Sequence, residues 1–172
     1  MAIGNRKTLF LSKHLTIMTG NITFTIIKPG AVTHEHIGDI LKMISEAGFW
    51  IAAMKYTKLS QNQAAYFYNV HLGKPFFEGL VDFMTSGPIV VAILEKENAV
   101  QDYRKLIGNT DPSKAEPGTI RKMFAESVQR NAVHGSDSDL NARKEADFFF
   151  SKSERFDREG NFLELVPTDC NC

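Results

Sequence analysis

The sequence predicts an α+β fold, in which helices pack on one side of a four-stranded antiparallel sheet in the order βαββαβ. Two segments, residues 22–27 and 89–94, are apolar and β-branched, as strands are. The second is a continuous apolar run, typical of a central strand buried on both faces. With 172 residues, 43% of them apolar, the chain is long enough for one domain with a sizeable core.

Periodicity and turn residues predict the next two elements. Pro29 ends the first strand, and apolar residues then recur at helical spacing over residues 37–44, a helix that Gly48 is expected to end. Residues 49–59 are strand-like. Three residues of this strand are expected on one face: Phe49, Ile51 and Ala53.

Helix-capping and helix-breaking residues, with periodicity, predict the remaining elements. Ser60 is a good N-cap for a helix that runs to about residue 70. The other predicted elements are a helix over 76–84, the strand 89–94, a helix over 97–107, a surface loop over 108–118, a short helix over 119–127, a short strand over 132–134 and a helix over 138–150.

The chain is expected to contain one domain between two extensions. Residues 1–20 are interpreted as a flexible extension, with Met18 as the natural start, because polar residues interrupt the apolar stretch and no cleavage site follows. Residues 21–150 form the domain, and residues 151–172 a partly irregular tail. The only cysteines, Cys170 and Cys172, lie in that tail and cannot staple a core, so a cytoplasmic location is expected.

The charge balance excludes some partners. Twenty basic and twenty acidic residues cancel, so no specific nucleic-acid binding is expected. No apolar run has the length of a membrane-spanning helix, and no membrane association is expected. The glycine patterns of the known phosphate-binding loops are missing, and His34 and His36 have no cysteine beside them. These two histidines are therefore expected to be solvated at the start of a helix.

The segment around His134 has the strongest chemical signal. Gly135 follows the histidine and should leave its ring open, Ser136 can hydrogen-bond nearby, and the next helix carries Glu145. A carboxylate that accepts a proton from one ring nitrogen leaves the other nitrogen as a nucleophile. The alternative is a buried histidine satisfied beside a turn. A serine hydrolase built from Ser136, His134 and Asp137 is not favoured, because residues so close in a turn rarely form the required relay.

A second signal is a scatter of cations beside turns. Lys28, Arg104 and Arg121, with Thr110 and Asn131, would suit a triphosphate if they converged. Each cation alone is more often a solvated charge.

Five segments together resemble the nucleoside diphosphate kinase family, in the order of that family. They are residues 23–32 (TFTIIKPGAV), Tyr68 with 73–77 (GKPFF), 86–88 (SGP), 118–121 (GTIR) and 131–137 (NAVHGSD), and the resemblance covers about residues 21–150. It implies a ferredoxin-like fold and a ping-pong reaction. His134 would attack the γ-phosphate of a nucleoside triphosphate through its δ nitrogen, and the phosphohistidine would pass the group to a nucleoside diphosphate.

The resemblance also implies roles for individual residues. Glu145 would hold the imidazole, Ser136 would support it, and Tyr68 would help to hold the transferred group. Phosphate and sugar contacts are implied for Lys28, Tyr68, Arg104, Thr110, Arg121 and Asn131. Phe76 would stack on the base, with Leu80 and Val128 lining the slot, so that every base is accepted. Mg²⁺ would be held mainly by nucleotide phosphates and water rather than by protein side chains. A homo-oligomer is implied, either a tetramer or a hexamer, with contacts from loop 108–118.

Three features depart from the family pattern. Gly30 replaces the usual aspartate, which removes a carboxylate and adds backbone freedom. The N-terminal twenty residues and the tail from Ser151 have no counterpart in the pattern. An active kinase is the first hypothesis, a non-catalytic nucleotide-binding or interaction module the second, and direct nucleic-acid binding or cleavage the third.

Overall fold

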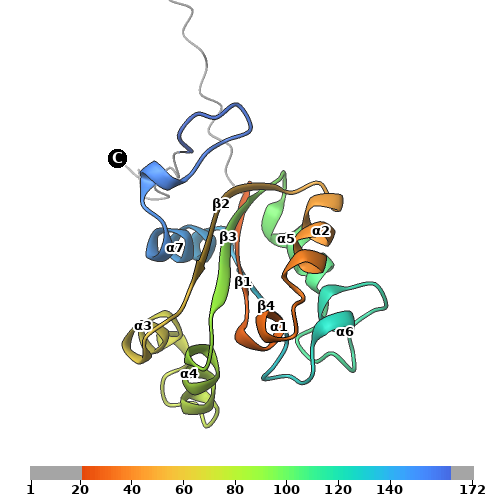
Figure 1. The fold of residues 1–172 in the computed structure, drawn as a ribbon, viewed down its shortest axis with the longest axis vertical. Helices are drawn as coiled ribbons and strands as arrows, with labels where there is room; N and C mark the ends of the chain where they lie inside the picture. The colour runs from red at the N-terminus through yellow and green to blue at the C-terminus, as the bar shows by residue number, and fades with distance from the viewer. Residues whose placement is uncertain (1–20, 164–172) are drawn as a thin grey trace, which may run out of the picture.

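A computed structural model describes residues 21–163 and shows a four-stranded sheet in the order β2-β3-β1-β4 (Figure 1). All neighbouring strands are antiparallel. The strands are β1 (Ile22–Ile27), β2 (Trp50–Thr57), β3 (Ile89–Glu95) and β4 (Val133–Gly135). β1 and β3 are central, and they are buried over nearly their whole length, as the apolar runs predicted. The predicted α+β, ferredoxin-like βαββαβ fold is confirmed.

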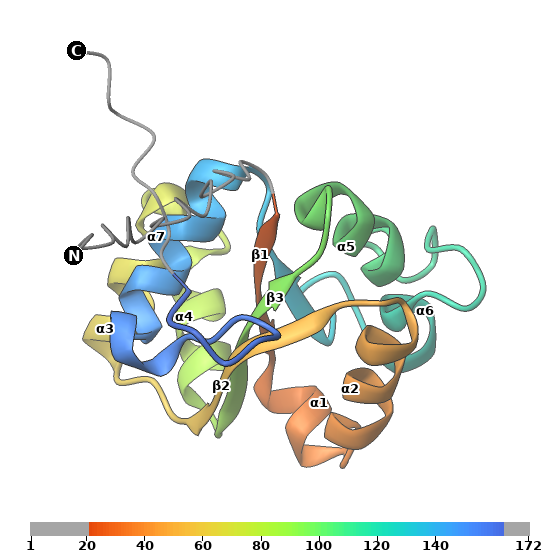
Figure 2. The ribbon, with the colours of Figure 1, turned by 90° about the horizontal axis from the view of Figure 1, so that it is seen from above.

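Helices cover both faces of the sheet, so the prediction of helices on one side was wrong (Figure 2). One face packs against α1 (Pro29–Thr33), α2 (Ile37–Glu46), α5 (Ala99–Ile107) and α6 (Ile120–Phe124). The other packs against α3 (Gln61–Phe67), α4 (Phe77–Thr85) and α7 (Asp139–Phe149). Along the chain, α3 and α4 lie between β2 and β3, and α7 follows β4. Alternate residues of the buried β1 strand contribute to the two cores, for example Ile26 to one and Ile27 to the other.

A β-bulge overturns the expected face of strand β2. Ile51 pairs with Leu94, and Ala53 pairs with the adjacent Ile93, so Ala52 is an extra residue in the ladder. The bulge moves Ala53 to the core of α3, α4 and α7, whereas Phe49 and Ile51 pack on the other side. An extra residue shifts the alternation by one, and every later side chain changes face.

The helix at Pro29 was not predicted, because Lys28-Pro29-Gly30 was interpreted as a strand end only. Proline fits the first turn of a helix, where its missing N–H has no partner to lose, and α1 has it at that position. The other helices match their predictions to within a few residues. Ser60 caps α3 with a capping box, and Gly48 ends the α2 turn with a positive φ of 84°. The predicted helix to residue 70 continues past α3 as the 3₁₀ helix η1 (Asn69–His71).

The two histidines predicted to be solvated lie at the start of α2 but contact other side chains. His34 Nδ1 is 3.4 Å from Glu126 Oε1, and the His36 ring centroid is 4.7 Å from that of Phe124.

The tail is partly ordered beside β2. After the 3₁₀ helix η2 (Lys152–Glu154), Phe156 and Phe162 form an isolated antiparallel bridge, and the Phe156 N–H donates to the Ala52 carbonyl at the bulge. Arg155 is almost fully buried and donates to Asp147 and to the Phe150 carbonyl. The predictions for residues 1–20, for Met18 and for both cysteines lie outside the described residues. Within residues 21–163 no helix is both long and apolar enough to cross a membrane.

Candidate functional site

His134 lies in the short edge strand β4, where it pairs with Ile26 of β1. Thr25 Oγ1 donates to the His134 carbonyl at 2.9 Å and also bonds the Tyr103 hydroxyl at 2.6 Å. Gly135 is required here by close packing. A Cβ on Gly135 would lie 2.9 Å from a ring carbon of Tyr103, closer than real Cβ contacts come. The glycine was expected to open the imidazole to solvent, and the structure shows that it also lets β4 approach α5.

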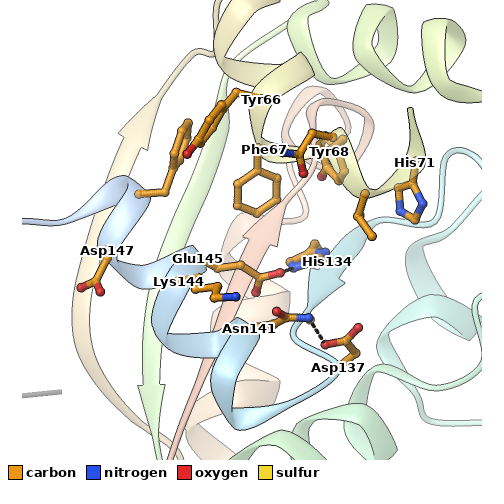
Figure 3. A pocket seen from close by; sticks show the side chains of 14 residues that line it. Tyr66, Phe67, Tyr68, His71, His134, Asp137, Asn141, Lys144, Glu145 and Asp147 are labelled. Atoms are coloured by element: carbon orange, nitrogen blue, oxygen red, sulfur yellow. Dashed lines mark hydrogen bonds and ion pairs between the residues drawn. The ribbon is translucent and has the colours of Figure 1, made fainter. Parts of the chain in front are cut away.

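A carboxylate from α7 holds the imidazole. Glu145 and His134 point toward one another (Figure 3), with 2.9 Å between Glu145 Oε1 and His134 Nε2. Ser136 Oγ donates to the other carboxylate oxygen at 2.6 Å, and Ser136 Oγ accepts the Phe24 N–H at 3.0 Å. An ionised carboxylate only accepts hydrogen bonds, so Nε2 carries the proton. The lone pair of the neutral ring is therefore on Nδ1, for which the described part of the chain provides no hydrogen bond.

Aromatic rings wall the imidazole on the side of α3. The His134 ring is edge-to-face with Phe67 at 5.6 Å and with Tyr68 at 6.4 Å, measured between ring centroids. The Tyr68 hydroxyl is buried and has no hydrogen-bond partner within residues 21–163. Burial, and then the charge of Glu145, raise the pKa of Tyr68 far above its usual value, so the hydroxyl stays a proton donor.

Lys28 and Asn131 meet at the end of β1. Lys28 Nζ donates to Asn131 Oδ1 at 2.7 Å, and Lys28 is only 6% exposed. Among the described residues no carboxylate pairs with this ammonium. Burial, and then the positive charge of Arg121, lower the pKa of Lys28 to about 7. The adjacent Ala132 has a φ of +64°, a conformation that costs a non-glycine residue roughly 1 kcal/mol or more.

Arg121 is a second buried cation held by neutral groups. Its guanidinium donates to the Gly108 and Val133 carbonyls at 2.9 and 3.1 Å, and it lies 3.5 Å from Thr110 Oγ1. Burial lowers the pKa of Arg121 to about 10, with a smaller lowering by Arg104, although Tyr103 opposes the shift. The guanidinium therefore remains charged at neutral pH. Arg104 and Thr110 are exposed, in contrast to Arg121.

A cavity of about 810 Å³ adjoins His134. Figure 3 shows its lining side chains, which come from α3, η1, β4 and α7. It includes His134, Glu145 and Tyr68 of the predicted site. Lys28, Arg121, Phe76 and the other predicted nucleotide contacts do not line it. The structure thus places three predicted residues in the wall of this cavity and the other predicted residues outside it.

Comparisons with known proteins identify the family of the chain. The protein-family model described as "Nucleoside diphosphate kinase" matches residues 21–155. The chain belongs to the nucleoside diphosphate kinase family. A nucleoside diphosphate kinase of Flavobacterium psychrophilum is 56% identical over 139 residues, which cover 81% of this chain and 100% of the relative. One from Nitratiruptor sp. is 58% identical over 132 residues, covering 77% of this chain and 96% of the relative.

Solved structures of the family share the fold. The nucleoside diphosphate kinase of Aquifex aeolicus superposes with a TM-score of 0.77 at 40% identity, covering 78% of this chain and 98% of that one. The enzyme of Halobacterium salinarum in complex with CDP gives a TM-score of 0.77 at 35% identity, covering 80% and 92%. The chain is therefore an enzyme of this kinase family, a phosphotransferase that acts on nucleotides.

The predicted base slot is open in this kinase fold. Phe76 is 52% exposed at the N-cap of α4, and Val128 is 55% exposed in the loop before β4. Leu80 is half-buried one turn into α4. These side chains therefore leave apolar surface accessible to a ligand.

The motif analysis did not single out His71. Its ring centroid lies 5.4 Å from that of Phe76 and 6.4 Å from that of Tyr68, and it also lines the cavity. Its position three residues after Tyr68 was a weak signal, because it is the 3₁₀ turn η1 that brings the ring between Phe76 and Tyr68.

The donor set fits a metal that arrives with the nucleotide. No group of three or more His, Cys, Asp or Glu side chains within residues 21–163 is arranged to hold a metal ion. The buried cations Lys28 and Arg121 instead suit phosphate oxygens rather than a bare cation. Asp137 is a carboxylate of the cavity wall, and hydrogen bonds from Asn141 and Ser138 lower its pKa.

Proposed function

We propose that the chain transfers the γ-phosphate of a nucleoside triphosphate to a nucleoside diphosphate through a phosphohistidine at His134. The observation that carries this proposal is the bond between Glu145 and His134 Nε2, which makes Nδ1 the nucleophile. In the first step a bond forms between Nδ1 and the γ-phosphorus, the bond to the bridging oxygen breaks, and the diphosphate leaves. In the second step the terminal oxygen of another diphosphate attacks the phosphorus, and His134 leaves as the neutral ring.

Glu145 stabilises the positive charge that the imidazole gains when its lone pair bonds phosphorus. The carboxylate already accepts the Nε2 proton at 2.9 Å and is itself fixed by Ser136, so it need not rearrange during the reaction. The buried Tyr68 hydroxyl lacks an acceptor among residues 21–163 and can donate to an oxygen of the transferred group.

In this proposal the buried cations form the phosphate-binding end of the site. Lys28 and Arg121 are buried with neutral partners only, and a bound polyphosphate would supply the missing negative charge. Arg104 and Thr110 would contact the outer phosphates, and Asn131 the ribose and phosphates. Mg²⁺ would be held mainly by the nucleotide phosphates and water and would neutralise part of the phosphate charge.

The open slot supports broad base specificity. Phe76, Leu80 and Val128 offer one aromatic face and aliphatic contacts, which every base can use. The CDP complex of the Halobacterium relative is consistent with this. A homo-oligomer, tetrameric or hexameric, and a cytoplasmic location complete the proposal.

Phosphate labelling tests the mechanism. ATP labelled at the γ-phosphate should give an acid-labile, alkali-stable label on the wild-type protein and none on His134→Asn, with an unchanged circular dichroism spectrum. His36→Asn, which changes a histidine away from β4, is the matched control and should keep the label. Undiminished labelling or turnover of His134→Asn would contradict the proposal.

A further inference from the structure

The loop of residues 125–132, between α6 and β4, carries two members of the proposed nucleotide site. Val128 faces the base slot in that proposal, and Asn131 accepts the hydrogen bond of Lys28. Whatever fixes this loop therefore also fixes one wall of the slot and the partner of a buried cation.

Glu126 ties the loop to the turn after α1. Its Oε1 lies 3.4 Å from His34 Nδ1, and its Oε2 lies 3.9 Å from Arg130 Nη1. Its backbone N–H also donates to the Arg130 carbonyl at 3.0 Å. The Glu126 carboxylate thus contacts both the turn after α1 and Arg130, at the far end of its own loop.

The same loop packs on α4, which begins just after Phe76. The Arg130 guanidinium carbon is 5.5 Å from the centroid of the Phe83 ring. Gln129 Nε2 lies 2.9 Å from the place where a Cβ on Gly79 would be. Val128 is next to Gln129, so the contact with α4 sets the distance between the two apolar walls of the slot.

Gly30 leaves the space that Glu126 uses. A Cβ on Gly30 would lie 3.6 Å from Glu126 Oε1 and 3.6 Å from the Phe83 ring. The φ of Gly30 is not positive, so its backbone does not require glycine, and the conformational freedom expected from the sequence is not used. The family pattern has an aspartate at this position. A carboxylate at position 30 would lie beside that of Glu126, and two like charges at such a distance repel.

We propose that Glu126 is a positioning residue, which supplies from the loop the carboxylate that an aspartate at position 30 would supply from α1. A single carboxylate at this contact, from either side, bridges His34 in the turn after α1 to Arg130 in the loop and thereby fixes Val128 and Asn131. This inference rests on the proposed nucleotide site, because only there does the loop position affect substrate binding.

A charge exchange between the two positions tests the proposal. Gly30→Asp places two carboxylates at the contact and Glu126→Gln leaves none, so each should raise the KM for dTDP about two- to fivefold at an unchanged kcat. The double variant Gly30→Asp/Glu126→Gln again has one carboxylate. Its KM should return to within about twofold of the wild-type value, so the two effects should be far from additive.

Amide hydrogen exchange of residues 125–131 provides a readout independent of activity. Exchange should be faster than wild type in each single variant and normal in the double variant. Glu97→Gln, an exposed carboxylate at the opposite end of the sheet, is the matched control and should change neither measurement.

Additive KM effects in the double variant, or a wild-type KM for Glu126→Gln, would overturn the proposal. A wild-type protein without kinase activity would instead contradict the proposed function, and the exchange measurements would still decide whether the two positions are coupled.

Discussion

The two halves of the site differ in how completely the protein satisfies its polar groups. In the half around His134, the residues Phe24, Ser136, Glu145 and His134 form one continuous chain of hydrogen bonds. The other half contains two buried cations, Lys28 and Arg121, that bond only neutral oxygens among residues 21–163. Buried charges are normally paired, so the second half lacks a negative partner. In the proposed mechanism His134 is thus oriented before substrate arrives, whereas a phosphate of the substrate would supply the negative partner of the two cations.

Among variants that keep His134, the largest effect is expected from Lys28→Met. Removal of this cation should lower kcat/KM by on the order of 10²- to 10³-fold, because a donor to the transferring phosphate is lost. The free energy of unfolding should not fall, since a buried cation without a carboxylate partner contributes little to stability. Steady-state kinetics and urea unfolding measure the two quantities. A large loss of stability would show that Lys28 is a structural residue instead.

A smaller kinetic effect is expected on the nucleophile side. Glu145→Gln keeps a hydrogen-bond acceptor beside Nε2 but removes the charge that stabilises the imidazolium. We expect kcat to fall roughly 10- to 100-fold with little change in KM. Single-turnover labelling by ATP should slow by the same factor and still reach full occupancy. An unchanged labelling rate would exclude the positioning role of this carboxylate.

Gly135→Ala tests the packing behind the nucleophile. The new Cβ would lie 2.9 Å from the Tyr103 ring and 3.0 Å from Ile107 Cδ1, so β4 or α5 must move. Overpacking of this kind costs about 1–3 kcal/mol of unfolding free energy. The matched control is Gly38→Ala, where a Cβ would meet nothing within 4 Å. Equal stability of the two variants would mean that the close approach is not needed.

The lowered pKa of Lys28 also predicts that the free energy of unfolding depends on pH. Burial, and then Arg121, lower the pKa of Lys28 from 10.5 to about 7 in the folded protein, while the unfolded chain keeps the ordinary value. Between these two values the unfolded state binds more protons, so the free energy of unfolding should rise with pH there. Lys28→Met should reduce that slope. An identical slope in both proteins would contradict the low pKa.

Phosphate binding should reverse this shift. A bound polyphosphate favours the charged ammonium, so nucleotide binding at pH 8 should take up part of a proton. Calorimetry in two buffers with different ionisation enthalpies measures the uptake. It should be smaller in Lys28→Met, and equal uptake would assign the proton to another group.

The sequence predicted most strands and helices because their patterns are local. Residues 22–27 are β-branched or aromatic at every position and residues 89–94 are all apolar, while Ser60 and Gly48 supply a cap and a stop that act on neighbouring residues. Two features were missed because they depend on context. The bulge at Ala52 is set by pairing with β3, and the α1 helix at Pro29 uses a residue that also ends strands. Which helices cover which face depends on packing that no single segment encodes.

The candidate site was predictable to a similar extent. His134 and Glu145 were paired from the sequence, and the 2.9 Å contact between their side chains agrees with that pairing. The lack of a carboxylate partner for Lys28, the unpartnered Tyr68 hydroxyl and the place of His71 arise from segments distant in sequence. The proposed replacement of a carboxylate at position 30 by Glu126 likewise depends on the contact of the α1 turn with the loop before β4.

The central claim is that Glu145 holds Nε2 and leaves Nδ1 to accept the phosphate. Nitrogen-15 NMR of the protein labelled at histidine and phosphorylated by ATP identifies the modified ring nitrogen directly. The account predicts one phosphohistidine, at His134, with phosphorus on Nδ1 and the proton on Nε2. Phosphorus on Nε2, or on a histidine other than His134, would contradict it.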